Sequence, residues 1–388
     1  MIGLIKFMDR HVGEFVCSFL GLFNKDKKIE NPAAAKKILI IQLWGIGETI
    51  LTLPAIEALR KRFPNSDIDA LTTQRNKDVY FGNKKISKVI TIKLNPFSWI
   101  NFILKNMKKY DLVIDMEEYL NASAIMSFFI GKNAVGYSHG ARANLYNVKV
   151  KYNDGQHAVQ TFLDLARALG ADYNSRALPK LNFSAKDKKF VDLFFKRNKL
   201  TGRKLIVCVS PGAAESAKAR IWPIERYSEL CDEIIQRHDA KIIFIGGASE
   251  EGMVNNIQNN MDFKGNSVNS AGKISLIQLF YLVGKCKIFI GNDSGPMHVA
   301  AAQKIKTIGL FGPNLPVRFG PYGEGNLGLY KGYNCEFSPC INVHKGQVPD
   351  CVFPKTGSDY QKCMKNIGVG EVLREVETML KQIHQHDI

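Results

Sequence analysis

Residues 289–302 read F-I-G-N-D-S-G-P-M-H-V-A-A-A and have the composition of an anion-binding turn. An apolar run ending at Ile290 indicates a buried strand, and the small and polar residues 291–295 break it. Pro296 suits the first turn of a helix, where its missing N–H costs nothing. The backbone N–H groups of residues 294–297 are then predicted to lie unpaired at a helix N-terminus, a place suited to a phosphate.

Asp293 and His298 flank this turn. An acid beside an anion site suggests a phosphorylated ligand that also offers hydroxyl groups, as a nucleotide sugar does. The same residues also fit an ordinary capped turn between a strand and a helix, because glycine-rich turns of this kind recur throughout α/β folds. Taken alone, the stretch is compatible with both interpretations.

The composition sets limits on the kind of protein that carries this turn. A chain of 388 residues is long enough for two domains with cores of their own, and 45% hydrophobic residues are typical of a globular protein. The formal net charge of +17 predicts anionic partners, which are phosphates, nucleic acid or a membrane surface. No paired Cys/His finger or aromatic RNA-binding pattern is present, so we expect no nucleic-acid partner.

Strand and helix patterns alternate along most of the chain. Residues 37–43 (K-I-L-I-I-Q-L) form a continuous apolar run typical of a buried parallel strand, and residues 44–49 (W-G-I-G-E-T) turn the chain into a helix. A second alternating series begins at Lys204 and includes S-P-G-A at 210–213. The pattern predicts an α/β fold with two open, doubly wound sheets. We place one domain at 36–185, a second at 200–368 and a final helix at 369–388.

Residues 1–30 are predicted to form an amphipathic helix with a basic end. Its most apolar part is too short to span a membrane, and Asp9, Glu14 and the lack of a small-residue cleavage site argue against a signal peptide. The helix either lies on a membrane surface or docks on the body of the protein. Between Gln74 and Tyr110, nine basic residues face one acid, which fits an anionic acceptor or a soluble surface.

The eight cysteines fall into two groups. Four lie in predicted strands or helices, where a thiol is usually a small core residue, and they favour a reducing compartment: Cys17, Cys208, Cys231 and Cys286. The other four have the spacing C-x4-C-x10-C-x11-C in a segment rich in proline and glycine: Cys335, Cys340, Cys351 and Cys363. A structural zinc, disulfide bonds and free thiols all remain compatible with this spacing.

Five motifs occur in one order along the chain: I-I-Q-L-W-G-I-G-E-T-I-L-T-L-P-A-I at 40–56, S-P-G-A at 210–213, W-P-I-E-R-Y at 222–227, G-N-D-S-G-P-M-H-V-A-A-A at 291–302 and F-G-P-N-L-P-V-R at 311–318. Together they resemble glycosyltransferase family 9, the heptosyltransferase family of lipopolysaccharide core assembly, over about residues 36–380. The resemblance implies a GT-B fold, in which two Rossmann-like domains face a central cleft. The N-terminal domain then binds the acceptor and the C-terminal domain binds the nucleotide-sugar donor.

The resemblance also implies the residues of the donor site. A basic residue before the W-P pair would neutralise the diphosphate, and either Lys218 or Arg220 could be that residue. His298 has a packing or capping role as readily as a direct contact. The candidate donor-binding residues are Ser210, Gly212, Lys218, Arg220, Asp293, Ser294, Gly295, Pro296, Met297 and His298. The candidate acceptor-binding residues are Gly47, Lys84, Lys85 and Arg142.

The first turn departs from the family pattern. The family's motif commonly ends in Gly-Asp, with the aspartate proposed as the base for the acceptor hydroxyl, whereas this chain has Gly47-Glu48. Glutamate can do the same chemistry, but its extra methylene moves the carboxylate by about 1 Å or more. Glu48 is therefore the candidate catalytic base, and the alternative is an acid that only complements the helix dipole.

We expect an inverting glycosyl transfer that requires no cofactor and no metal, from an ADP-heptose-like donor to an anionic, lipid-linked glycan of the lipopolysaccharide core. Cations and helix N-termini would stabilise the departing diphosphate. The expected location is the cytoplasm, at the inner face of the membrane, with a monomer favoured. Two alternatives are a non-catalytic membrane-surface protein that binds phosphorylated glycans and an NAD-dependent oxidoreductase; the first turn lacks the third glycine that the latter needs.

Overall fold

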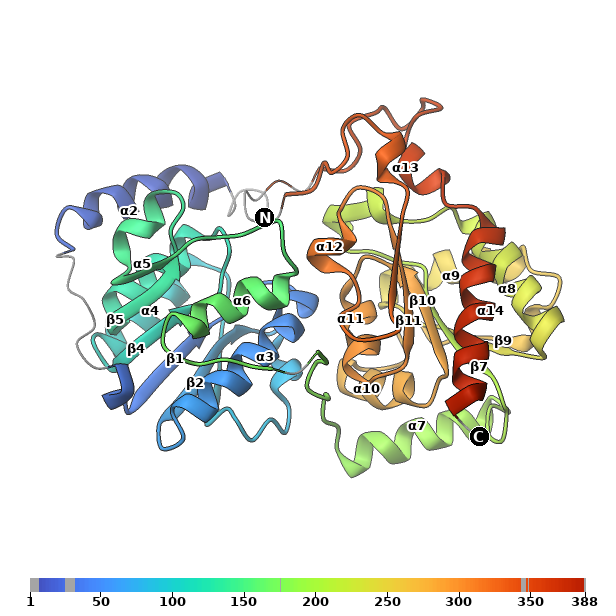
Figure 1. The fold of residues 1–388 in the computed structure, drawn as a ribbon, viewed down its shortest axis with the longest axis horizontal. Coiled ribbons are helices and arrows are strands. Elements are labelled where there is room, and N and C mark those ends of the chain that lie inside the picture. The colour runs from blue at the N-terminus through green and yellow to red at the C-terminus, as the bar shows by residue number, and fades with distance from the viewer. Residues whose placement is uncertain (1–6, 25–31, 175, 343–346, 348, 387–388) are drawn as a thin grey trace. The chain divides into compact units, whose positions relative to one another are not determined.

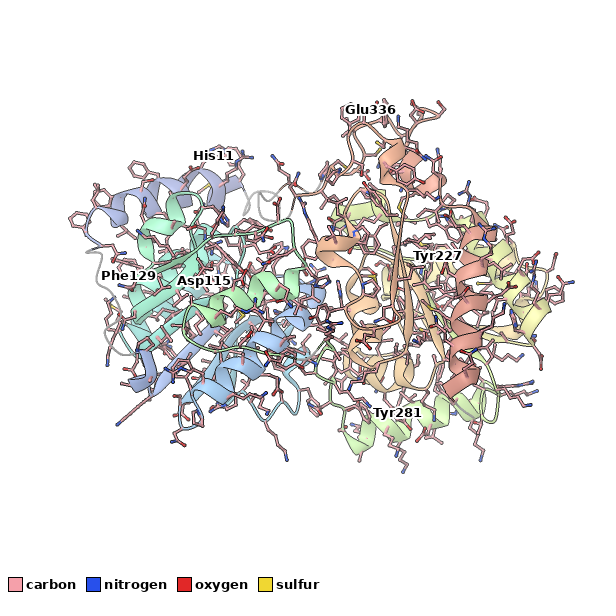
Figure 2. All side chains as sticks on the ribbon, viewed as in Figure 1. His11, Asp115, Phe129, Tyr227, Tyr281 and Glu336 are labelled. Atoms are coloured by element: carbon pink, nitrogen blue, oxygen red, sulfur yellow. The ribbon has the colours of Figure 1, made fainter. Side chains whose placement is uncertain are left out.

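The computed structural model describes residues 7–24, 32–174, 176–342, 347 and 349–386 (Figure 1). The chain divides into two compact units, residues 1–175 and 176–388, and each has a parallel six-stranded sheet with helices around it. The prediction of an α/β fold with two doubly wound sheets is confirmed. Asp115 and Tyr227 are fully buried, one in each unit, whereas His11 and Glu336 lie at the surface (Figure 2).

The sheet of the first unit has the strand order β3-β2-β1-β4-β5-β6, so its order reverses at β1. There Ile38 pairs with Ile68 on one side and with Leu112 on the other. The strands are β1 (Lys37–Ile41), β2 (Asp67–Thr73), β3 (Lys88–Ile92), β4 (Tyr110–Asp115), β5 (Gly131–Tyr137) and β6 (Val148–Val150). In such a sheet, ligands bind beyond the carboxyl ends of the strands near the point of reversal.

The helices of the first unit pack in two groups, α3 with α6 and α4 with α5. An N-terminal segment made of η1 and α2 also packs against α5 and the turn η4. The helical elements are η1 (Asp9–Gly13), α2 (Glu14–Gly21), α3 (Ile46–Arg62), α4 (Pro96–Asn106), α5 (Asn121–Ile130), η4 (Ala141–Leu145) and α6 (Ala158–Arg167). None of the helices in the described ranges of either unit is long and apolar enough to cross a membrane.

The sheet of the second unit has the equivalent order β12-β11-β10-β7-β8-β9. Its strands are β7 (Ile206–Ser210), β8 (Lys241–Phe244), β9 (Ser267–Asn269), β10 (Ile288–Asn292), β11 (Lys306–Phe311) and β12 (Leu327–Tyr330). Its helices are α7 (Ala185–Arg197), α8 (Ile224–His238), α9 (Glu251–Asn259), α10 (Leu276–Gly284), α11 (Gly295–Ala302), α12 (Pro316–Phe319), α13 (Lys362–Lys365) and α14 (Val369–His386).

Two segments that we predicted to lie outside the second domain belong to its unit. Residues 185–197, which lie between the two predicted domains except for Ala185, form α7, which packs on α10 through an ion pair of 2.7 Å between Asp192 and Lys285. The C-terminal helix α14 packs on α8 and places Val372, Val376 and Leu380 in the same core as β7 and β10. The second unit therefore extends on both sides of the predicted range 200–368.

Candidate functional site

The carboxyl edge of the second sheet is held together by the buried side chain of Asn292, the last residue of β10. Its amide nitrogen donates to the carbonyl of Pro211, in the loop after β7, at 2.7 Å. Its amide oxygen accepts from the Trp222 backbone N–H at 3.1 Å and from the Tyr227 hydroxyl at 3.0 Å. One side chain thus joins the loop after β7 to the turn that begins α8.

Asp293 and Arg220 form an ion pair directly beyond Asn292. A guanidinium nitrogen of Arg220, the last residue of η5 (Glu215–Arg220), lies 3.1 Å from the Asp293 carboxylate and also 3.1 Å from its backbone carbonyl. Asn314, in the loop after β11, donates to the same carboxylate at 2.8 Å. Asp293 is only 4% exposed, so its carboxylate is engaged inside the protein and holds the Arg220 side chain in place.

The N-terminus of α11 begins one residue later and has Pro296 in its first turn, as predicted. The Met297 N–H differs from our expectation, because it donates to the Ser294 carbonyl at 3.1 Å. Pro296 has no N–H, so the amides of Ser294 and Gly295 are the donors that the helix itself does not satisfy. Among the described residues, the buried Ser294 hydroxyl and Arg220 Nε have no hydrogen-bond partner. These donors are of the type that binds an anion.

A further carboxylate, that of Glu250, lies in the loop that follows β8. Glu250 accepts from the Gly247 N–H at 2.6 Å, and its carboxylate occupies the space beside Gly212 that a side chain at position 212 would need. Burial raises the pKa of Glu250, and the hydrogen bond from Gly247 opposes that rise. The edge therefore combines anion donors with an acceptor that suits a ligand hydroxyl group.

In the first unit, the turn after β1 places the Glu48 carboxylate beside Gly45, the residue just before α3. Gly45 has a φ of 42°, a conformation that favours glycine, and the Glu48 carboxylate fills the space beside its Cα. Glu48 is the third residue of α3, where an acid complements the helix dipole. Its side chain is half-buried, so this geometry accommodates both the catalytic and the dipole-complementing interpretation.

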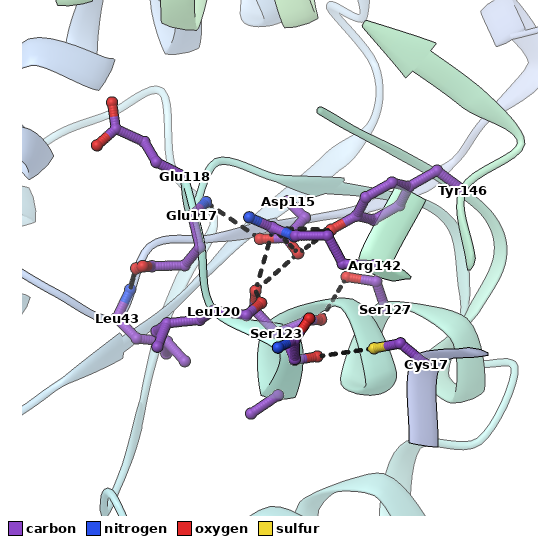
Figure 3. Close-up of polar contacts among 12 residues, drawn as sticks. Cys17, Leu43, Asp115, Glu117, Glu118, Leu120, Ser123, Ser127, Arg142 and Tyr146 are labelled. Atoms are coloured by element: carbon purple, nitrogen blue, oxygen red, sulfur yellow. Dashed lines mark hydrogen bonds and ion pairs between the residues drawn. The ribbon is translucent and has the colours of Figure 1, made fainter. Parts of the chain in front are cut away.

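Glu117, just beyond the carboxyl end of β4, fastens the same turn (Figure 3). One of its carboxylate oxygens accepts the N–H groups of Leu43 and Trp44, the latter at 2.9 Å, and the Gln42 amide at 3.3 Å. Glu117 is 2% exposed, and burial raises its pKa to about 8 against the opposing effect of these hydrogen bonds. The raised pKa favours the protonated form of this buried carboxyl group.

The raised pKa of Glu117 predicts a pH dependence of stability. Between the ordinary pKa of 4.5 and the folded value of about 8, the folded state binds a proton that the unfolded state has released. The contribution of Glu117 to the unfolding free energy is therefore complete below the unfolded pKa and falls by up to about 1.4 kcal/mol per pH unit as pH rises toward 8. We expect Glu117→Gln to flatten this slope in denaturant titrations across the range. An unchanged slope would contradict the prediction.

The chain is similar to the proteins of one known family. The model of "Glycosyltransferase family 9 (heptosyltransferase)" matches residues 104–344, more than half of the chain. The chain belongs to glycosyltransferase family 9. The Campylobacter jejuni (serotype O:2, NCTC 11168) lipooligosaccharide heptosyltransferase 2 is 25% identical over 90% of this chain and 99% of that protein. The chain is therefore a glycosyltransferase, an enzyme of the predicted class.

Two solved structures support the GT-B fold of this family 9 member. A family 9 glycosyltransferase from Veillonella parvula DSM 2008 superposes with a TM-score of 0.75 at 23% identity, over 89% of this chain and 97% of that one. The E. coli ADP-heptose lipopolysaccharide heptosyltransferase II superposes with a TM-score of 0.69 at 21% identity, over 90% and 99%.

Of the two candidate cations of this family 9 enzyme, Arg220 lies beside Asp293, whereas the Lys218 side chain is exposed and its carbonyl accepts from Gln361 at 2.8 Å. Ser210 is the buried last residue of β7, two residues before Gly212. Met297 packs its sulfur over Gly309 of β11, which makes its side chain a core element. His298 is also buried, in the first turns of α11.

The predicted acceptor residues do not gather at one place. Gly47 adjoins Glu48, but Lys84 and Lys85 precede the amino end of β3, and the Lys85 carbonyl accepts from Arg60, twelve residues along α3 from Glu48 and thus about 18 Å away. Lys85 also pairs with Glu57 at 3.0 Å. These two lysines therefore lie near the opposite edge of the sheet from Glu48.

Arg142, the fourth predicted acceptor residue, is buried, and its guanidinium is not at the surface where an acceptor would contact it. Its guanidinium pairs with Asp115 at 2.9 Å, and the Tyr146 hydroxyl donates to the same carboxylate at 2.6 Å (Figure 3). The adjacent carboxylate and Tyr146 keep the pKa of Arg142 above its ordinary value despite burial. This placement makes Arg142 a core residue that fixes η4 against the end of β4.

The four cysteines of the C-terminal segment line one small pocket together with Asp350 and Lys362. All eight cysteines of the chain are free thiols, and Cys17, Cys208, Cys231 and Cys286 are buried as expected. In the described part of the chain, no three Cys, His, Asp or Glu side chains are arranged to hold a metal. Neither the disulfide nor the preformed zinc arrangement is present among these residues.

Sequence reasoning missed Glu117, Glu250 and Asn314 and assigned no role to Asn292. Two of these four stand inside motifs that we quoted, Asn292 in G-N-D-S-G-P and Asn314 in F-G-P-N. Glu250 follows two glycines at a strand end, and Glu117 follows β4 in the acidic run D-M-E-E. An acid or amide at the end of a buried parallel strand or in the loop that follows it is the signal that could have identified them.

Proposed function

We propose that this enzyme transfers a heptose from ADP-heptose to an acceptor sugar of the lipopolysaccharide core. Family membership and the name of the Campylobacter relative support the reaction. The observation that carries the donor assignment is the Arg220–Asp293 pair beside the N-terminus of α11. That arrangement presents a fixed cation and backbone donors together, which suits a diphosphate.

The donor roles follow from the contacts of the second unit. We assign the diphosphate to the amides of Ser294 and Gly295, the Ser294 hydroxyl and the Nε of Arg220, because these groups are donors that nearby protein atoms leave unused. Glu250 is the acceptor for a ribose hydroxyl, since an acid near a glycine turn at the carboxyl edge of a doubly wound sheet commonly serves this purpose.

The transfer step needs a base and a stabilised leaving group. In our proposal, Glu48 takes the proton of the acceptor hydroxyl as that oxygen attacks the anomeric carbon of the donor. The new bond from carbon to oxygen forms as the bond to the diphosphate breaks, so the configuration inverts. The electron pair leaves with ADP, and its charge is met by Arg220 and the α11 N-terminus. No metal ion takes part in this scheme.

The acceptor that we propose is an anionic, lipid-linked glycan. An enzyme that acts on it works in the cytoplasm at the inner face of the membrane, as a peripheral protein and, in our proposal, as a monomer. The net charge of +17 supports an anionic surface or acceptor as the partner.

A transfer assay tests the proposal. The purified protein is incubated with ADP-heptose and a heptose-deficient lipopolysaccharide core, and both ADP release and the acceptor mass are measured. We expect ADP release together with a gain of one heptosyl unit per acceptor. UDP- and GDP-sugars serve as matched donors and should give no product. Acceptor binding without ADP release from any donor would contradict the proposal and favour a non-catalytic glycan-binding protein.

A further inference from the structure

The N-terminal segment of η1 and α2 is fastened to the first unit through its small and polar residues. The Asp9 carboxylate accepts the N–H groups of Asn121 and Ala122 at 3.0 and 2.8 Å and thereby caps α5. Gly13 and Gly21 lie so close to the body that an added Cβ would come within 2.8 and 2.6 Å of neighbouring side chains. Asp9, Gly13, Cys17 and Gly21 recur every four residues, so one side of the segment faces inward.

The opposite side of the same segment carries large apolar residues and is exposed. Phe15 is 71% exposed and Leu22 is 80% exposed. The exposed large residues fall at helical spacing along one face: Met8, Val12, Phe15, Phe19 and Leu22. A surface helix of a globular protein normally turns its large apolar residues toward the core. In this segment the arrangement is reversed: the small residues contact the first unit, and the large apolar residues face outward.

A second helix of this unit, α4, has the same kind of outer face. Its inner side places Trp99, Phe102 and Ile103 against the sheet. Its outer side exposes further large residues: Phe97, Ile100, Leu104 and, just after the helix, Met107. Helix α4 is therefore apolar on two sides. Both α4 and the η1–α2 segment pack against α5, so the two exposed faces flank one helix of the same unit.

Basic residues accompany the apolar ones. The chain from Asp78 to Asp111 contains no acid between these two residues. The exposed lysines around α4 are Lys93, Lys105, Lys108 and Lys109. Exposed apolar side chains with basic residues beside them match the two parts of an anionic bilayer surface, its acyl boundary and its phosphate headgroups.

We propose that the outer faces of α2 and α4 form a membrane-docking surface for a bilayer with anionic lipids. Its basis is the face of Met8, Val12, Phe15, Phe19 and Leu22, joined by the apolar and basic residues of α4. The inference extends the proposed function, because it names the surface that brings the enzyme to a lipid-linked acceptor. Apolar side chains enter the acyl boundary while the lysines contact the headgroups.

Vesicle flotation of the full-length protein tests this surface. We use phosphatidylcholine vesicles with and without phosphatidylglycerol, and we expect binding that requires the anionic lipid. A variant with Phe15→Ser, Phe19→Ser and Leu22→Ser should bind about tenfold more weakly or worse, because it removes three apolar groups from the bilayer contact. A variant with Ile100→Ser and Leu104→Ser on α4 should also bind more weakly.

The matched control is Phe190→Ser with Leu193→Ser, which alters exposed apolar residues of α7 in the second unit and should leave flotation unchanged. Thermal unfolding and ADP binding of each variant distinguish loss of the surface from loss of the fold. Absence of wild-type flotation, or equal flotation of the triple variant, would overturn the inference. A dimer that the triple variant abolishes, without vesicle binding, would instead assign the face to a second copy of the chain. A variant that no longer floats with vesicles but still binds ADP would show that the docking surface is lost while the donor site is intact.

Discussion

Arg220→Ala is expected to lower kcat/KM for the donor by about 10²–10³-fold, the range seen when one preorganised donor to a developing charge is removed. The guanidinium is fixed by two contacts of 3.1 Å with Asp293, and its Nε is a buried donor without a partner among the described residues. The diphosphate gains most charge as the sugar departs, so the loss should appear in kcat as well as in KM. Steady-state kinetics with varied ADP-heptose measure both.

Two variants separate this role from a purely structural one. Lys218→Ala removes a neighbouring exposed cation and should change kcat/KM by no more than about threefold. Arg220→Ala also leaves Asp293 buried without its cation, at a cost to stability of about 3–5 kcal/mol. Adding Asp293→Asn should recover much of that stability but not the activity. If the double variant regained activity together with stability, Arg220 would be a structural residue only.

Glu48→Gln is expected to reduce kcat by about 10²–10⁴-fold, because the amide cannot accept the proton of the acceptor hydroxyl. The KM for the donor should stay within about twofold, since the base acts on the acceptor and not on bound ADP-heptose. The fold should persist, because a glutamine fits the space beside Gly45 that the carboxylate now fills. Single-turnover rates with saturating donor and acceptor measure the effect.

Glu57→Gln is the matched control for Glu48, since it makes the same substitution on the same helix, about two and a half turns away, where Glu57 pairs with Lys85. It should leave turnover near the wild-type value. Glu48→Asp tests the reach of the base and should retain part of the activity that Glu48→Gln loses. Wild-type turnover in Glu48→Gln would leave this residue as an acid that only complements the α3 dipole.

The fold was largely predictable because each central strand is a continuous apolar run. The run at residues 37–43 predicted β1, which begins at Lys37 and ends at Ile41. The short strands β9 and β12 were missed, because they have four residues or fewer and are half-buried. Helix α7 was also missed, because its charged sequence lies between the two predicted domains. Its capping box, with Ser184 and Asp187 bonded to each other's backbone N–H groups, was the local signal of a helix start.

Of the candidate site, only the positions of the loops could be predicted from the sequence. Strand ends followed by glycine and polar residues located the turns after β1, β7 and β10, because parallel strands present their carboxyl ends at one edge of a sheet. The pairing of Arg220 with Asp293 could not be read from the chain, since 73 residues separate them. The burial of Arg142 depends on Asp115 and Tyr146 in the same way. Contacts of this kind arise from packing, which charge patterns along the sequence do not encode.

The contacts of Asn292 have a consequence for the way the donor arrives. Arg220 lies in a loop outside the sheet, but the start of α8 that follows it is bonded to a side chain rooted in the central strand β10. This end of the loop therefore becomes ordered when the unit folds, before any ligand binds. Preorganisation of this kind reduces the conformational entropy that association would otherwise remove. We accordingly expect donor binding to resemble the docking of a ligand into a rigid receptor, with little induced fit at this loop.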